Sequence, residues 1–95
     1  MRISQSDIVV SLAGHDRGTL FFVVAEDGDS VLVADGKRRR IENPKRKNRK
    51  HVRHVARIDS RVAGRLRQGD RVTNRALRKE LAACGRQSGY YQGGQ

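Results

Sequence analysis

The sequence has one cysteine, one proline, no tryptophan and only four other aromatic residues. Because Cys84 is alone, no disulfide can form within the chain, which favours a reducing compartment such as the cytoplasm. No apolar stretch follows the basic Arg2, so we expect neither a signal peptide nor a membrane anchor. No segment pairs a basic face with a broad apolar face carrying Trp or Phe, which disfavours a lipid surface as the partner.

Residues for catalysis are also missing. The chain shows no acid–base pair in a setting that would shift a pKa, no nucleophile motif and no phosphate-binding glycine loop. The aspartates of the first third are explained as turn and loop residues. His51 and His54 could chelate a metal only on a helix, and no second pair of ligands accompanies them. The sequence therefore predicts that the protein is not an enzyme and has no cofactor, no metal site and no small-molecule substrate.

Basic charge is the dominant feature that remains. The chain has 21 Lys and Arg residues against 10 Asp and Glu, a formal net charge of +11. Residues 1–36 have a net charge of −4, residues 37–57 of +10 and residues 58–95 of +5. Charge of one sign at this density opposes compaction unless a polyanion lies nearby. An apolar, slightly acidic segment followed by a basic one predicts a scaffold and then a binding surface, with nucleic acid as the leading partner.

Apolar, β-branched runs alternate with turn signals before residue 58, which predicts strands. Two Asp-Gly pairs, at Asp27-Gly28 and Asp35-Gly36, favour tight hairpin turns and an antiparallel meander. Pro44 cannot donate a ladder hydrogen bond, so we expect it to end the fourth strand and begin an irregular basic tract at Lys45 to Lys50. The five expected strands are Ile8–Leu12, Thr19–Ala25, Ser30–Ala34, Lys37–Ile41 and residues 50–54.

Helical signals begin only after residue 58. A first short helix is expected from Asp59 or Ser60 as N-cap to Gly69 as its stop. A second is expected from Thr73 as its cap to Gly85, with one apolar stripe. Residues 87–95 are rich in glycine and are expected to be disordered, which leaves the role of Tyr90 and Tyr91 open. The expected organisation is a barrel at 1–57, a helical extension at 58–86 packed on or beside it, and this tail.

Five short strands with tight turns predict a small closed barrel, since closure removes exposed sheet edges. The strand lengths favour an SH3-like over an OB-like barrel, so the expected fold is mostly β with one or two short C-terminal helices. Phe21 and Phe22 are adjacent in a strand and must face opposite sides. One of them is expected in the core; the other either packs under the C-terminal helices or offers a platform for base stacking.

The stretch Ser6 to Gly36 resembles the KOW motif, in which an apolar strand, a loop with a fixed glycine matched here by Gly18, and a second apolar strand follow one another. Several large-subunit ribosomal proteins and transcription elongation factors share that motif. The continuation through Val31–Lys37 and Ile41–Lys45, with a helix starting at Val72-Thr73-Asn74, is similar to small bacterial KOW-domain RNA-binding proteins related to archaeal and eukaryotic large-subunit ribosomal proteins. The resemblance covers about residues 6–82.

This resemblance implies an SH3-like barrel that contacts structured RNA, such as large-subunit ribosomal RNA, through its first loop and the basic surface after its third strand. Ribosomal proteins would be further partners. Arginine suits the phosphates of A-form RNA because its guanidinium is a planar fork of donors. The candidate RNA-binding residues are His15, Arg17 and Gly18 in the first loop, Lys37, Arg38, Arg39 and Arg40 after the third strand, and Lys45, Arg46, Lys47, Arg49, Lys50, His51 and Arg53 in and after the basic tract.

The residues of the first loop also fit roles that need no RNA. A tight turn accounts for Gly18 without any ligand, and simple solvation accounts for His15 and Arg17. A second function for the whole chain is a KOW module of the transcription machinery that binds polymerase or nascent RNA. A DNA-compacting protein is disfavoured because no helix has a free basic face long enough to fill a major groove.

Overall fold

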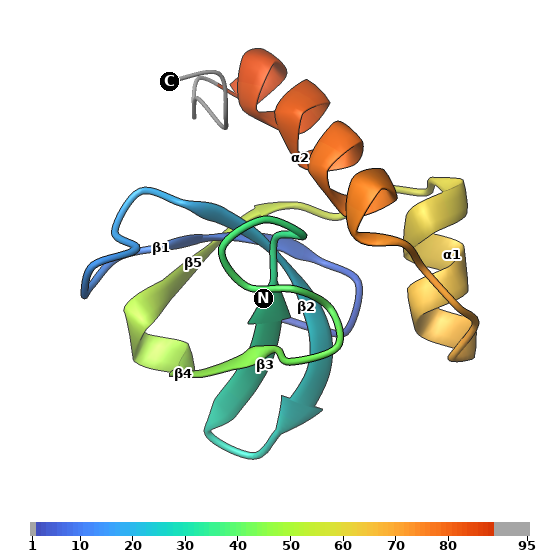
Figure 1. The fold of residues 1–95 in the computed structure, drawn as a ribbon. Helices are drawn as coiled ribbons and strands as arrows, with labels where there is room; N and C mark the ends of the chain where they lie inside the picture. Colours follow the sequence, from blue (N-terminus) through green and yellow to red (C-terminus); the bar gives the residue numbers. More distant parts are fainter. Residues whose placement is uncertain (1, 89–95) are drawn as a thin grey trace.

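A computed structural model describes residues 2–88 of the chain and shows a curled sheet with two helices along one side (Figure 1). The sheet is antiparallel, with strand order β4-β3-β2-β1-β5. A mostly β chain with a five-stranded antiparallel sheet and two helices confirms the expected class at this level. The elements are β1 (Ile8–Ser11), β2 (Leu20–Asp27), β3 (Ser30–Ala34), β4 (Lys45–Asn48), the 3₁₀ turn η1 (Arg49–His51), β5 (Val52–Ala56), α1 (Arg61–Gln68) and α2 (Asn74–Ser88).

The strand β1 and the first half of β2, residues 20–23, are buried on both faces, which explains their continuous apolar runs. Phe21 packs in a core that lies within the curled sheet, together with Val9, Val23, Val31, Val33 and Val52. Phe22 faces the other way and packs with Leu66, Leu77 and Leu81 from the two helices. Of the two expectations for the second phenylalanine, packing under the helices is confirmed, since both rings are at most 2% exposed.

The expected strand Lys37–Ile41 is wrong, because these residues form a loop. The Asp35 carboxylate accepts hydrogen bonds from the backbone N–H groups of Lys37 and Arg39, both at 2.9 Å. The backbone N–H groups of Asp35 and Gly36 in turn donate to the Arg39 carbonyl. These bonds close the chain on itself and take groups that a strand would use in a ladder. Only the first Asp-Gly pair forms a tight hairpin, at Gly28 between β2 and β3.

The fourth strand lies further along, at Lys45–Asn48, in the tract that we expected to be irregular. Pro44 directly precedes this strand instead of ending one, so its missing N–H costs no ladder bond. The closing strand begins at Val52 and not at residue 50, because Asn48 caps η1 through a 2.9 Å bond from the Lys50 N–H to its side-chain oxygen. This short turn carries the chain from one edge strand, β4, to the other, β5.

The caps of α1 confirm the expectation: Ser60 Oγ accepts from the Ala63 N–H at 3.1 Å, and Gly69 ends the helix with φ of 74°. Thr73 likewise accepts from the Ala76 N–H at the start of α2. The expected end of α2 at Gly85 is wrong, because the helix runs on to Ser88. A glycine inside a helix costs only about 1 kcal/mol, and burial of Leu81 and Cys84 against the sheet offsets it.

Gln87 and Ser88 therefore belong to a helix, not to a disordered tail. The rest of the expected tail, with Tyr90 and Tyr91, lies outside the described residues. Between residues 2 and 88, neither helix is long and apolar enough to cross a membrane.

Candidate nucleic-acid interface

The first loop, residues 12–18, is fastened to the edge strand β4 by the buried carboxylate of Asp16. Its Oδ1 accepts from Ser11 Oγ at 2.7 Å and from Lys47 Nζ at 3.0 Å, and its Oδ2 accepts from Lys45 Nζ at 2.9 Å. Lys47 Nζ also donates to the carbonyl of Ala13 at 3.1 Å. These bonds join the loop between β1 and β2 to β4, an edge strand that does not pair with β1 in the sheet.

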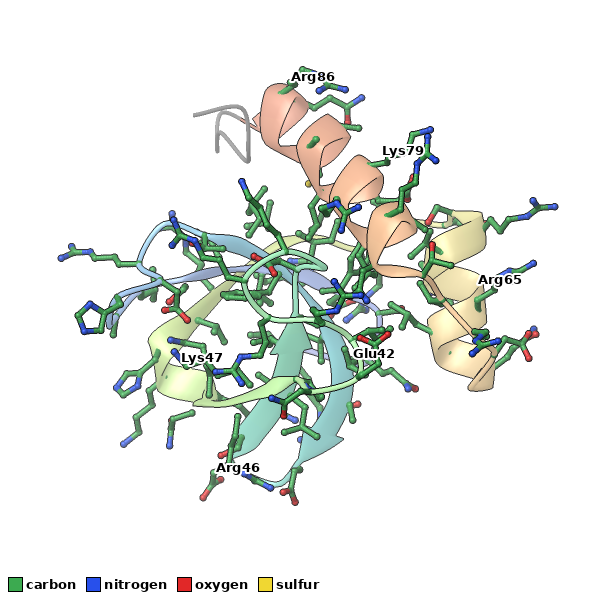
Figure 2. The ribbon with its side chains drawn as sticks, in the orientation of Figure 1. Glu42, Arg46, Lys47, Arg65, Lys79 and Arg86 are labelled. Carbon is green, nitrogen blue, oxygen red and sulfur yellow. The ribbon has the colours of Figure 1, made fainter. Side chains whose placement is uncertain are left out.

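In this cluster the ammonium groups of Lys45 and Lys47 share the one carboxylate of Asp16. Burial alone would raise the pKa of the Asp16 carboxyl, but hydrogen bonds from Ser11, Lys45 and Lys47 hold that pKa far below its usual range. The Lys47 side chain is only 6% exposed and lies beneath the first loop (Figure 2). Its ammonium group therefore serves as an internal strut of the fold and does not reach the surface.

The half-buried side chain of Arg49 also binds partners within the molecule. Its guanidinium donates to the carbonyls of Gly28 and Ile3, each at 2.7 Å, and to Glu26 Oε1 at 3.0 Å. The Arg49 hydrogen bond is the largest influence on Glu26, and it lowers the pKa of that carboxyl. Arg49 thus holds the N-terminal segment and the β2–β3 hairpin against η1.

Arg46 lies away from the first loop, at the β2–β3 hairpin (Figure 2). It is exposed and pairs there with the equally exposed carboxylate of Asp27. Along β4, alternation sends Lys45 and Lys47 toward Asp16 and sends Arg46 to the opposite face. The basic tract is therefore divided between two sides and does not form one continuous surface.

Four of the expected contact residues do gather around the first loop. Leu12 donates its N–H to the His51 carbonyl at 2.8 Å, which sets η1 beside the loop. His15 and Arg17 in the loop, and Lys50 and His51 in η1, are exposed, and none of their side chains has a polar partner among residues 2–88. We call these four residues the loop-end cluster. Arg53 is exposed on β5 nearby, where it pairs in register with Val10.

Gly18 completes the first loop at φ of +87°, a conformation that L side chains rarely adopt. Its N–H donates to the Ser11 carbonyl at 2.8 Å, and a Cβ added there would have open space around it. The turn alone thus accounts for this glycine.

The remaining expected contacts lie in the loop 35–44, which is fastened to the start of α2. Asn74 accepts from the Ile41 N–H at 2.8 Å and donates to both oxygens of Glu42, and Arg78 donates to the Gly36 carbonyl at 2.6 Å. The Asn74 bond is the main cause of the lowered pKa of Glu42. This anchoring displays Lys37, Arg38 and Arg40 as exposed cations, with Arg39 half-buried.

Asp7 forms the second buried ion pair of the sheet. Burial alone would raise the pKa of its carboxyl, but two bonds that the carboxylate accepts from Arg57, at 2.8 and 2.9 Å, lower that pKa overall. His54 lies beside it, with Nε2 at 3.5 Å from Oδ2. In the described part of the chain, no group of three or more His, Cys, Asp or Glu side chains could hold a metal ion.

No model of a known protein family matches the chain, and no curated protein matches it either.

Sequence reasoning missed two aspects of this surface. It counted Lys45, Lys47 and Arg49 as free cations, although the alternation along residues 45–48 could have put both lysines on one face. It also left out the arginines of the helical region, although Arg61 and Arg65 lie four apart on the first helix and off its apolar stripe.

Proposed function

We propose that this protein is a non-enzymatic RNA-binding module of the SH3-like, KOW type that contacts structured RNA, with large-subunit ribosomal RNA as its leading target. The resemblance of residues 6–82 to KOW proteins supports the fold type and the target. A curled five-stranded antiparallel sheet with helices added after it is compatible with that type.

One observation carries the proposal: three acidic side chains of the sheet form ion pairs within the molecule, whereas the basic side chains of the loop-end cluster form none with the described residues. Asp7, Asp16 and Glu26 each accept bonds from Lys or Arg within the molecule. Among the described residues, the four members of the loop-end cluster form no ion pair, and within residues 37–40 only Arg40 forms one, with Glu42. Phosphates of RNA would supply the missing negative charge.

The test is a salt titration of binding to a structured RNA hairpin, read by fluorescence anisotropy. If about six phosphates are contacted, log K falls against log salt with a slope of roughly −4 to −5. A slope near zero would remove the electrostatic argument. A competing DNA duplex should displace the RNA poorly, because the sheet offers no helix for a major groove.

A pair of variants locates the contact. The double variant Arg17→Gln/Lys50→Gln removes two unpaired charges of the loop-end cluster and should reduce the slope by about 2 units. The matched control Arg2→Gln/Arg46→Gln removes two charges that are already paired with Glu26 and Asp27 at the hairpin. Equal losses from both variants would mean that only net charge matters and that the loop end is not the interface.

In cells, the protein should sediment with the large ribosomal subunit at low salt and leave it as salt rises. Co-purification with RNA polymerase, and absence from the ribosome, would instead assign the module to transcription.

A further inference from the structure

A second cationic surface lies outside the residues assigned so far, where the segment between the two helices meets the loop 35–44. A hollow of about 410 Å³ is lined there by Arg40, Glu42, Arg71, Val72, Thr73, Asn74 and Arg78. A second hollow of about 260 Å³ is lined by Arg61, Val62, Arg65, Arg71, Val72, Thr73 and Ala76. The two hollows share Arg71, Val72 and Thr73 and therefore adjoin each other, and we call the two together the arginine groove.

Five arginines converge on this groove from four parts of the chain. Arg40 comes from the loop 35–44, Arg61 and Arg65 from α1, Arg71 from the inter-helix segment and Arg78 from α2. The single carboxylate in the lining is that of Glu42, which is already bound by Asn74 and pairs with Arg40 at 3.4 Å. The Arg71 side chain lines both hollows and makes no hydrogen bond or ion pair with any residue in the range 2–88.

The position of the helices explains why these charges stay exposed. The apolar sides of α1 and α2 are used against the sheet, through Leu66, Leu77 and Leu81. Their arginines must then lie on the remaining sides, as Arg65 does in Figure 2. Asn74 and Arg78 fix α2 to the loop 35–44, so the cations on both sides of the groove keep a constant spacing.

The chemistry favours a phosphodiester chain over an acidic protein as the occupant. Guanidinium forks pair with phosphate oxygens in two-bond geometry. A protein partner would need an apolar anchor at the centre of its interface, but among the described residues the only exposed large hydrophobic side chain is Leu12, which is not part of the groove. Arg40 also belongs to the loop whose cations already face the proposed RNA.

We propose that the arginine groove binds a second stretch of RNA phosphodiester backbone, continuous with the stretch that contacts residues 37–40. This inference rests on the proposed function, and it extends the RNA path from the sheet onto the helices. The protein then contacts RNA along two adjoining surfaces instead of at one loop end.

The test compares Arg61→Gln/Arg71→Gln with Lys79→Gln/Arg86→Gln, in the same salt titration with a structured RNA. Lys79 and Arg86 are exposed on α2 and project away from the sheet (Figure 2), so the control removes equal charge outside the groove. We expect the groove variant to bind at least about tenfold more weakly at physiological salt, with a salt slope smaller by about 2 units. The control should change affinity less than about threefold, because neither residue lines the groove and exposed charges without a phosphate contact are screened by salt. Thermal melts of both variants verify that the fold is kept.

Four outcomes are distinguishable. If the groove variant loses affinity and slope while the control does not, the inference stands. If the wild type binds RNA, the loop-end variant is impaired and the groove variant matches its control, the arginine groove is not an RNA site and the proposed function survives. If the wild type does not bind RNA, both proposals fail. Loss of polyglutamate binding in the groove variant without loss of RNA binding would also overturn the inference, in favour of an acidic protein.

Discussion

Lys47 gives the sharpest test of whether a basic residue in this chain supports the fold or contacts RNA. The substitution Lys47→Met keeps most of the aliphatic stem and removes the ammonium. The folded protein then loses the bonds from Nζ to Asp16 at 3.0 Å and to the Ala13 carbonyl at 3.1 Å. Asp16 keeps its bonds from Ser11 and Lys45, so its charge stays partly compensated.

The magnitude follows from these contacts. Breaking a buried ion pair by removing one partner costs about 3 to 5 kcal/mol, and a hydrogen bond to a charged group contributes about 1.5 to 3 kcal/mol. Because Lys45 remains beside Asp16, we expect a loss of about 2 to 3 kcal/mol in the free energy of unfolding. For a domain of this size that corresponds to a fall in Tm of about 10 to 20 °C.

Differential scanning calorimetry at neutral pH measures the loss, and an RNA titration well below the lowered Tm measures binding. The folded variant should bind RNA with an unchanged salt slope. The control Arg46→Met lies one residue away on the same strand, where its side chain is 58% exposed beside Asp27, and it should change stability by no more than about 0.5 kcal/mol. A Lys47→Met protein with an unchanged Tm and a salt slope reduced by one unit would refute the assignment of Lys47 as a strut.

Two further predictions concern stability. Gly36→Ala should lower the free energy of unfolding by about 3 kcal/mol or more, because an alanine at φ of +79° is strained and its Cβ would collide with the Asn74 carbonyl. Gly18→Ala, at φ of +87° but with open space around the added Cβ, should lower it by only about 1 to 2 kcal/mol. Equal thermal shifts in the two variants would contradict the close approach of α2 to Gly36. The lowered pKa values of Asp7 and Asp16 make the protein acid-sensitive. The unfolded chain takes up protons at these carboxyls near pH 4, about the usual pKa of Asp, whereas the folded chain takes them up only at lower pH. The stability that these two carboxylates contribute is therefore present above about pH 4 and is lost as the pH falls below it. Thermal melts from pH 7 to pH 2 should show this loss, and Asp16→Asn should flatten part of it; a melting profile of that variant parallel to the wild type would mean that Asp16 is not among the groups responsible.

The parts of the fold that follow local rules could be predicted from the sequence. The third strand and the caps of α1 at Ser60 and Gly69 depend on neighbours within a few residues, so composition and spacing were sufficient. The second Asp-Gly pair misled because its outcome depends on distant contacts. Gly36 packs against Asn74, and the Arg78 guanidinium binds its carbonyl from 42 residues away. The Asp-Gly pair itself does not distinguish this loop from the hairpin at Gly28.

The candidate site, too, has parts that the sequence could predict and parts that it could not. A sequence shows that residues 45–50 are basic, but it does not show that Lys47 has a carboxylate partner 31 residues earlier. His15 and Arg17 could be anticipated because they lie in a predicted loop, whereas Lys50 and His51 were expected on a strand and are placed beside that loop by η1. The arginine groove could not, since it exists only where the inter-helix segment meets a loop whose fold was itself mispredicted.

These pairings change how the net charge should be interpreted. Of the eleven cations in residues 37–57, five form ion pairs with carboxylates of the first third: Lys45, Arg46, Lys47, Arg49 and Arg57. These five pairs involve four carboxylates, those of Asp7, Asp16, Glu26 and Asp27, so they lower the net charge of +10 on that segment by four and leave it basic. Residues 58–95 have a smaller net charge, +5, but their arginines have few such partners. The charge available to a polyanion is thus shared between the sheet and the helices, and the salt slopes lost by the loop-end and arginine-groove variants should be of similar size.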